Sequence, residues 1–258
     1  MRRRIFAYPY IAWMVLFVIV PLFFILGYAF WDNGVFSFDH MARALEGQTF
    51  KVLGHSALVA AETAAVCLLL GYPAALMLSR MKKGAAALLS TLFVVPMWMN
   101  FLLRVYALKI LLPRGLLYTE WAVLAGMVYD FLPFMILPIY TTLQKLDKSY
   151  LEAAQDLGAN AFVTFWRVVL PLSVPGIVSG ITMVFVPSVT TFAISDLLGG
   201  KMTGLLFGDL IYNRFISDNL YGVGSSLSLV LMVFVLISMG VMRLFDKDTP
   251  GEQGGRLW

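Results

Sequence analysis

Four carboxylates lie within or beside long apolar stretches of this chain: Glu62, Asp130, Asp196 and Asp209. An ionised carboxylate at the centre of a membrane helix costs roughly 2.5–3.5 kcal/mol on insertion scales, so such groups usually have a function or a partner. The chemistry open to them is the binding of a cation. Asp130 is the most informative of the four, because it lies well inside the apolar stretch 121–143.

Each of these acids also has a competing interpretation. Asp130 can pair with Arg104 or Lys109 instead of facing a solute, and the two interpretations carry nearly equal weight. Glu62 can extend to the outer membrane interface, which is slightly favoured over a place in a solute path. Asp196 can cap a turn just outside the fifth apolar stretch.

Aromatic side chains near Asp130 can supply surfaces for a bound cation: Trp98, Tyr106 and Tyr129. Each of them singly is better explained by packing or by anchoring at the interface. No catalytic or metal-binding constellation accompanies them, since His40 and His55 are isolated and Cys67 is the only cysteine. An enzyme and a metal site are therefore not expected, and Cys67 is expected to pack as a small apolar residue.

A second pattern lies in a polar loop, 144–167, between two apolar stretches. Its spacing is Glu-Ala-Ala, three residues, Gly, nine residues, an aliphatic residue, one residue, Leu-Pro, and its members are Glu152, Ala153, Ala154, Gly158, Val168, Leu170 and Pro171. We expect Ser149 to cap a helix with Glu152 in its first turn, and Gly158 to end that helix. A second short helix, 161–167, then leads to Pro171. The small alanines would let a partner protein approach closely, although a helix that only lies on the lipid is the alternative.

The elements that position these residues are membrane helices. Of 258 residues, 60% are hydrophobic and only 13% are charged, which excludes a soluble globular domain. Stretches of about 20 apolar residues predict six spans, at about 10–30, 57–78, 85–103, 121–143, 168–192 and 223–242. The fold class is therefore all-α and polytopic, with one transmembrane domain over 1–245 and a polar tail over 246–258.

The distribution of positive charge predicts the orientation. Twelve Lys and Arg residues fall in the loops and ends on one side of the six spans and five on the other, which places both termini and the loop 144–167 in the cytoplasm. The net charge of +4 reflects this orientation, and no nucleic-acid partner is expected. Outside, residues 31–56 are expected to hold a short helix near 41–45, and the glycine-containing segment 193–222 to dip back toward the membrane.

The spacing over 152–171 resembles the cytoplasmic loop of the membrane subunits of bacterial ATP-binding-cassette importers of type I, with Val168 where Ile is usual. The resemblance implies that Glu152, Ala153, Ala154, Gly158, Leu170 and Pro171 couple the chain to a separate ATPase. Glu152 would help fix that contact. The nearest phosphate-loop candidate in this chain, 199–202, lacks the required spacing and hydroxyl. ATP and Mg are thus expected on the partner, and no cofactor on this chain.

Further stretches look like the first permease subunit of spermidine/putrescine importers, among them Leu70–Pro73, Val95–Asn100, Leu103–Lys109 and Ser195–Gly200. That resemblance implies a bacterial inner-membrane protein, a heterodimer with a second permease, two ATPase copies and an external substrate-binding protein. It also implies that the acids and aromatics line a polyamine path. It does not separate spermidine from putrescine. The alternatives are a permease of this class for another solute and an ion-coupled transporter or channel, which would not need the loop.

Overall fold

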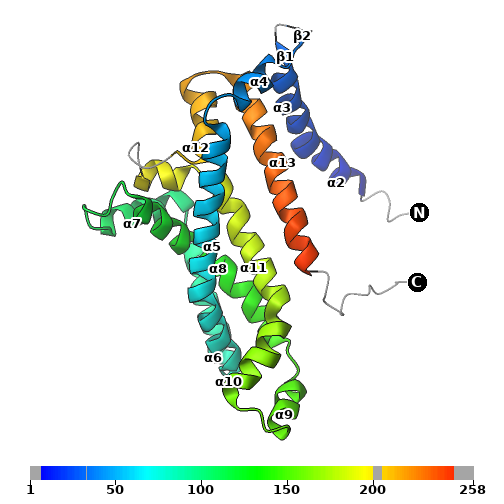
Figure 1. Cartoon of the computed structure of the whole chain (residues 1–258), viewed down its shortest axis with the longest axis vertical. Helices are drawn as coiled ribbons and strands as arrows, with labels where there is room; N and C mark the ends of the chain where they lie inside the picture. The colour runs from blue at the N-terminus through cyan, green and yellow to red at the C-terminus, as the bar shows by residue number, and fades with distance from the viewer. Residues whose placement is uncertain (1–6, 33, 200–204, 247–258) are drawn as a thin grey trace.

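The computed structural model describes residues 7–32, 34–199 and 205–246 as helices with one short hairpin (Figure 1). Helices dominate because the backbone groups of a lipid-exposed segment must be hydrogen-bonded within the segment itself. The predicted polar tail lies outside the described residues from 247 onward, as do Arg2–Arg4 and residues 200–202 of the phosphate-loop candidate.

The elements follow one another as α2 (Ala7–Met14), η1 (Val15–Ile19), α3 (Val20–Phe30), β1 (Trp31–Asp32), β2 (Val35–Phe36), α4 (Asp39–Leu45), α5 (Thr49–Arg80), α6 (Lys83–Val94), η2 (Val95–Trp98), α7 (Phe101–Leu111), α8 (Glu120–Gln144), α9 (Lys148–Asp156), α10 (Ala161–Thr164), η3 (Phe165–Val169), α11 (Leu170–Thr190), η4 (Ser195–Gly199), α12 (Phe207–Tyr212), η6 (Asn213–Ser217) and α13 (Tyr221–Asp246).

Five continuous helical stretches are long and apolar enough to cross a membrane, and a sixth is broken. The five are Pro9–Phe30, Thr49–Arg80, Glu120–Gln144, Ala161–Thr190 and Tyr221–Leu244. The sixth consists of Gly84–Trp98 and Phe101–Leu111, which meet at an angle of 96°. The predicted all-helical, multi-span class is confirmed.

The third expected span, 85–103, is therefore not one straight helix. Pro96 has no amide hydrogen to donate, and it lies in the 3-10 turn η2 that ends the first half. Met99 is then extended, and the Asn100 side chain caps α7 by accepting the Leu102 N–H at 2.9 Å. Hydrophobicity alone predicted one continuous helix here, but a proline followed by a good helix cap turns the chain.

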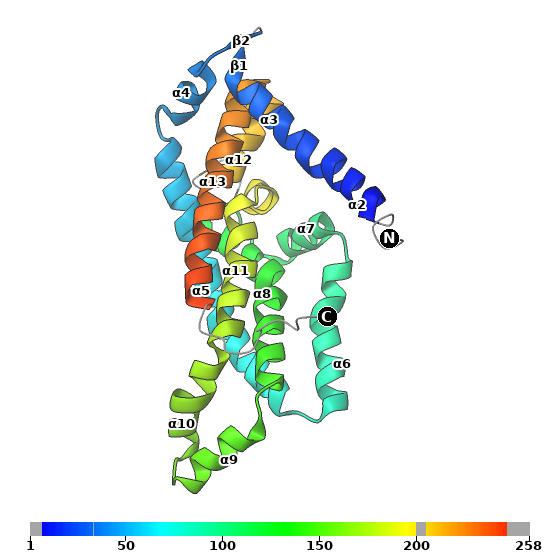
Figure 2. The same cartoon turned by 90° about the vertical axis from the view of Figure 1, so that its right-hand side faces the viewer.

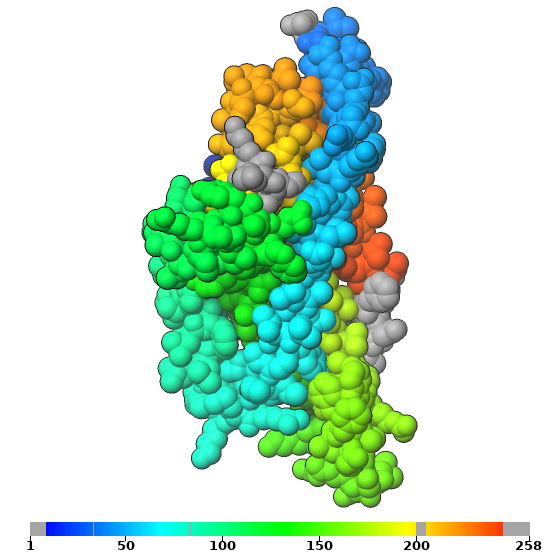
Figure 3. All heavy atoms as spheres, turned by 60° about the vertical axis from the view of Figure 1, so that its left-hand side comes forward, coloured from blue at the N-terminus to red at the C-terminus, as the bar shows by residue number. Residues whose placement is uncertain are grey.

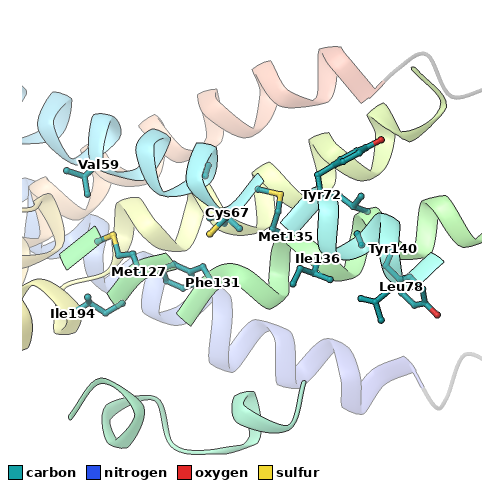
Figure 4. Close-up of a cluster of buried hydrophobic side chains, with 14 of the residues drawn as sticks. Val59, Cys67, Tyr72, Leu78, Met127, Phe131, Met135, Ile136, Tyr140 and Ile194 are labelled. Atoms are coloured by element: carbon teal, nitrogen blue, oxygen red, sulfur yellow. The ribbon is translucent and has the colours of Figure 1, made fainter. Parts of the chain in front are cut away.

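Helices α5, α8 and α11 form the core of the bundle, and their buried side chains make one continuous cluster (Figure 4). Met127, Met135, Ile136 and Ile139 of α8 are at most 1% exposed. Cys67 of α5 is fully buried in the same cluster, as expected for a small packing residue. Because α8 is enclosed by its neighbours, it anchors the other elements.

Two glycines let α11 approach α8 closely. A Cβ atom on Gly176 would lie 2.6 Å from Thr142 Oγ1 and 2.9 Å from the Pro138 carbonyl oxygen. A Cβ atom on Gly180 would lie 2.7 Å from the Met135 sulfur. The spacing of small residues, weak evidence by itself, thus marks a real helix contact.

The opposite end of the molecule from α9 carries a cap of short elements (Figures 1 and 2). The hairpin β1–β2 precedes α4, which confirms the short helix expected near 41–45. In the segment 193–222, η4 and α12 fold inward, and Ser56 of α5 accepts the Phe207 N–H at 2.7 Å. The first span leans away from the bundle, and in its most apolar stretch no residue is buried by the rest of the chain.

The α8–α11 contact predicts that replacing a glycine by alanine destabilises the protein at the contact but not elsewhere. Gly176→Ala should lower the free energy of unfolding by about 1–3 kcal/mol, because the new methyl group meets a backbone oxygen that cannot move freely. Gly54→Ala is the matched control: its Cβ meets nothing within 4 Å, so it should be neutral or stabilise by about 0.5–1 kcal/mol. Thermal unfolding in detergent measures both. Equal effects of the two variants would show that the close approach is absent.

Candidate functional site

Helix α9 forms the centre of the loop that the sequence singled out, and it begins earlier than expected. Asp147 is its N-cap and accepts the Ser149 N–H at 3.0 Å, so Ser149 lies inside the helix and the expected cap is wrong. Glu152 consequently falls in the second turn. That hydrogen bond holds the pKa of the Asp147 carboxyl below its usual value, which keeps a negative charge at the positive end of α9. The Asp-Lys-Ser order was the available signal, since Asp caps as well as Ser.

Gly158 ends α9 in the geometry that favours glycine. Its φ is +80°, its N–H donates to the Gln155 carbonyl at 2.8 Å, and the Ala159 N–H donates to the Ala154 carbonyl at 3.0 Å. These two bonds form a Schellman motif, which satisfies the last carbonyls of the helix. Any side chain at this position would strain the turn, so Gly158 sets the direction in which the chain leaves α9.

Helix α9 lies at the lower end of the space-filling view (Figure 3). Glu152, Ala153 and the turn that follows are exposed. Leu157 is 89% exposed, an unusual position for a large apolar side chain in a polar loop. Ala154 lies on the other side of α9 and is buried, so the expectation that both alanines face a partner holds in the geometry only for Ala153. The period of the helix separates adjacent residues by about 100°.

After α9 the chain returns as one helical rod. Asn160 caps α10 by accepting the Val163 N–H at 2.9 Å, and α10, η3 and α11 then follow without interruption. The wide π-helical turn η3 comes directly before Leu170 and Pro171. Proline removes one helical hydrogen bond and crowds the preceding turn, which accounts for the widening there.

Asp130 is paired with Arg104. The Arg104 Nη2 atom lies 2.8 Å from Asp130 Oδ1, and the two residues are only 7% and 3% exposed. Of the two interpretations that the sequence left open, the structure shows the ion pair. Lys109, the other candidate partner, lies over the Tyr118 ring at 5.5 Å. The pair joins α7 to α8 and so holds the second half of the broken span against the core.

The remaining three acids occupy different environments. Glu62 is exposed on α5, next to the buried Thr63, whose hydroxyl lies 3.5 Å from the Met127 sulfur. It forms no ion pair within the described part of the chain. Asp196 is exposed in the first turn of η4. The structure therefore leaves Glu62 and Asp196 accessible on the single chain.

Asp209, by contrast, is buried and forms hydrogen bonds within the cap. Its carboxylate accepts the Ser195 hydroxyl at 2.7 Å and the Leu206 N–H at 3.0 Å, which ties α12 to η4. Burial raises the pKa of the Asp209 carboxyl to about 6, with these hydrogen bonds opposing the shift and the charge of Asp196 adding to it. Sequence reasoning did not identify Ser195 as its partner, because the two residues are fourteen positions apart in the chain and only the fold brings them together.

The predicted aromatic residues do not gather around Asp130. Trp98, Tyr106 and Tyr129 are 80%, 49% and 47% exposed, and none of them encloses the Arg104–Asp130 pair. Among the described residues, no cluster of three or more His, Cys, Asp or Glu side chains is arranged to hold a metal ion. These three aromatic side chains are therefore accessible on the single chain.

The chain is similar in sequence to known proteins. Residues 67–249 match the family described as "Binding-protein-dependent transport system inner membrane component". The chain is 38% identical to the spermidine/putrescine transport system permease protein PotB of Salmonella typhimurium (strain SL1344), over 92% of each chain. It is 36% identical to the protein of that name from Escherichia coli (strain K12), over 94% of this chain and 98% of the relative.

The fold also matches solved structures. One is a bacterial ABC transporter involved in the import of the acidic polysaccharide alginate, with a TM-score of 0.70, 19% identity and coverage of 94% of this chain and 96% of that chain. Another is the bacterial alginate ABC transporter in complex with an alginate pentasaccharide-bound periplasmic protein, with a TM-score of 0.71, 18% identity and coverage of 95% and 94%. At these identities the likeness concerns the fold.

The Arg104–Asp130 pair predicts strong coupling between two mutations. Asp130→Asn should destabilise the protein by roughly 3–5 kcal/mol, because it leaves a buried guanidinium without its partner charge. Replacing both residues, Arg104→Met with Asp130→Leu, should recover most of that loss. Asp218→Asn is the control, since it breaks the half-exposed Arg214–Asp218 pair and should change stability by at most about 1 kcal/mol. Thermal unfolding in detergent gives the values, and a double variant that is at least as destabilised as Asp130→Asn would contradict the pairing.

Proposed function

Because the chain belongs to the family of binding-protein-dependent transport system inner membrane components, we propose that it is the permease subunit of an ATP-driven polyamine importer of the inner membrane. The observation that carries this proposal is the 38% identity, spread over 92% of the chain, to a spermidine/putrescine permease. The substrate class would be a flexible cation with several ammonium groups. The preference between spermidine and putrescine would be set largely by the external binding protein.

The ATPase would act on the permease through residues Lys148–Val169, which we call the coupling segment. Glu152, Ala153, Leu157 and Gly158 offer an exposed surface on one short, well-capped helix, which a groove of a cytoplasmic ATPase can hold. ATP and Mg would be bound and ATP hydrolysed there, not on this chain. The fixed turn at Gly158 and the continuous rod through Leu170 and Pro171 favour transmission of movement as a rigid body.

The rest of the assembly follows from surfaces that the single chain leaves open. The first span exposes large apolar side chains along its length, including Trp13, Phe17 and Phe23, and presents them to lipid and to a second, homologous permease. The cap formed by α4, η4 and α12 would receive an external substrate-binding protein. Two copies of the ATPase would bind the two permeases, one at each coupling segment, and nucleotide-driven closure would alternate access to the path between them.

We assign Glu62 as the strongest candidate for contact with the polyamine. It lies near the middle of α5, about 20 Å along the helix from Thr49, and its side chain points away from the core of its own chain. An exposed carboxylate at such a depth is costly in lipid, so it favours a face toward the second permease and a wet path. Asp196 is placed to meet the substrate earlier, at the cap.

The other expected path residues take secondary roles in this proposal. Asp130 lies in an ion pair with Arg104, and both carboxylate oxygens of Asp209 lie within hydrogen-bond distance of the Ser195 hydroxyl. Neither acid therefore offers a free charge to the path in this proposal. Trp98, Tyr106 and Tyr129 are exposed and can offer cation–π surfaces once the second permease covers them.

The coupling role predicts loss of uptake without loss of insertion. In the reconstituted assembly, ATP-dependent uptake of labelled spermidine should fall to background when Glu152→Lys is combined with Gly158→Arg, because charge and turn geometry both change. The variant should reach the membrane in normal amount. The control is Gln48→Lys, at the other end of the bundle, which should transport normally. Unchanged uptake by the double variant would exclude the coupling role.

The path role predicts a charge-specific defect at Glu62. Glu62→Gln should reduce spermidine uptake roughly tenfold or more, since a charge-assisted contact is worth about 1.5–3 kcal/mol, while basal ATPase activity persists. Glu62→Asp keeps the charge and should retain part of the uptake, and Glu120→Gln, an exposed acid in the first turn of α8, should retain all of it. If Glu62→Gln transports as well as the unchanged protein, Glu62 belongs to the interface with lipid headgroups.

A further inference from the structure

A cavity of about 710 Å³ lies between the coupling segment and the ends of α5 and α8, and Glu152 of the proposed ATPase contact is one of its lining residues. The end of α5, the end of α8, and the residues of α9 through η3 line it, represented by Leu78, Leu143, Leu151 and Phe165. In Figure 2 these elements converge at the lower end of the molecule. A ligand there would touch the coupling segment and the core helices together.

The polar part of the lining is positively charged. Arg80, from the last turn of α5, and Lys148, from the first turn of α9, both line the cavity, and Glu152 is the one carboxylate in its lining. Neither cation forms an ion pair with any residue that the structure describes. Two cations from separate elements that converge on one cavity favour an anion with several acceptor oxygens.

Thr164 gives an independent indication of a polar ligand. The residue lines the cavity, is only 8% exposed, and its hydroxyl has no hydrogen-bond partner among the described residues. Most helical Thr side chains in this chain donate to a carbonyl one turn earlier, as Thr63 and Thr182 do. A buried hydroxyl without a partner costs about 1–3 kcal/mol, so an acceptor inside the cavity would remove that cost.

The remaining lining is apolar and continues along membrane helices. Leu76, Met81, Ala86 and Val169 belong to or adjoin the ends of candidate membrane spans, so the apolar wall of the cavity continues along these helices. A free phosphate would leave these walls in contact with water. A phospholipid satisfies both parts, because its phosphate meets the cations and the hydroxyl while its acyl chains cover the apolar wall.

We propose that this cavity binds an anionic phospholipid, whose phosphate contacts Arg80, Lys148 and Thr164. The lipid links the end of α5 to the start of α9 across the cavity and so holds the coupling segment at a fixed distance from the core. Its headgroup belongs to the cytoplasmic leaflet, a placement that rests on the proposed function. Coupling between ATP hydrolysis and transport then depends on anionic lipid.

The direct test measures bound lipid on the complete assembly. The assembly is placed in discs of phosphatidylcholine mixed with phosphatidylglycerol, extracted in mild detergent, and its retained lipid is quantified by mass spectrometry. The unchanged protein should retain phosphatidylglycerol, and Arg80→Gln with Lys148→Gln should retain roughly tenfold less. Thr164→Val, which keeps the volume, should lose part of it. The matched control, Lys82→Gln with Lys145→Gln, changes neighbouring cations outside the lining and should retain as much as the unchanged protein.

Three results would overturn the proposal. The first is equal retention of phosphatidylglycerol by both double variants. The second concerns the thermal stability of the assembly. If inorganic phosphate raises it in pure phosphatidylcholine discs as much as phosphatidylglycerol does, the ligand is a free phosphate. The third is weaker binding of the ATPase by the Arg80 and Lys148 variant with unchanged lipid retention, which would assign the cavity to a segment of the ATPase.

A functional readout separates this proposal from the proposed function. Spermidine uptake per ATP hydrolysed should rise severalfold with phosphatidylglycerol in the unchanged assembly and respond less in the Arg80 and Lys148 variant. Absence of spermidine uptake under every lipid composition would contradict the polyamine assignment and leave the lipid-retention result standing. Uptake that is coupled equally well in pure phosphatidylcholine would contradict the lipid role.

Discussion

The close packing of α8 between α5 and α11 is the constraint on which the rest of the structure depends. Inside a bilayer the hydrophobic effect does not drive helices together, so contact relies on small residues and on shape. Gly176 and Gly180 of α11 bring its backbone against Met135, Pro138 and Thr142 of α8. With α8 fixed in this way, the Arg104–Asp130 pair can hold α7, and the ends of the core helices can position the coupling segment.

The coupling segment is joined directly to this core, because α8 precedes it and α11 follows it in the chain. Helix α8 leads through Asp147 into α9, and the chain returns through Asn160 into the rod that contains η3 and α11. Both ends of the segment therefore belong to helices that pack on each other. A partner that binds α9, as we propose, would therefore contact an element joined to two helices of the core.

The sequence predicted the helices and turns of this protein better than it predicted the contacts between them. Long apolar stretches and a membrane class follow from composition, and the break of α9 at Gly158 follows from the freedom of glycine at positive φ. The bend at Met99 was missed because hydrophobicity does not register a proline followed by a cap. The partner of Asp130 stayed open, since two cations lay within reach and only packing decides between them. The cavity near Thr164 could not be foreseen, because it forms where residues 140–169 fold against residues 76–86, which are distant in sequence.

Disulfide cross-linking between α9 and the ATPase subunit tests the central claim most directly. Leu157→Cys, in a chain whose buried Cys67 is replaced by Ala, offers an exposed thiol beside Gly158, and Ile110→Cys, 84% exposed in α7, is the control at a distant site. With single cysteines placed along the ATPase surface, we predict a cross-link from position 157 alone, with spermidine uptake blocked until the disulfide is reduced. A complex that forms no cross-link at 157, or that transports fully while cross-linked, would contradict the role of α9 as the moving contact.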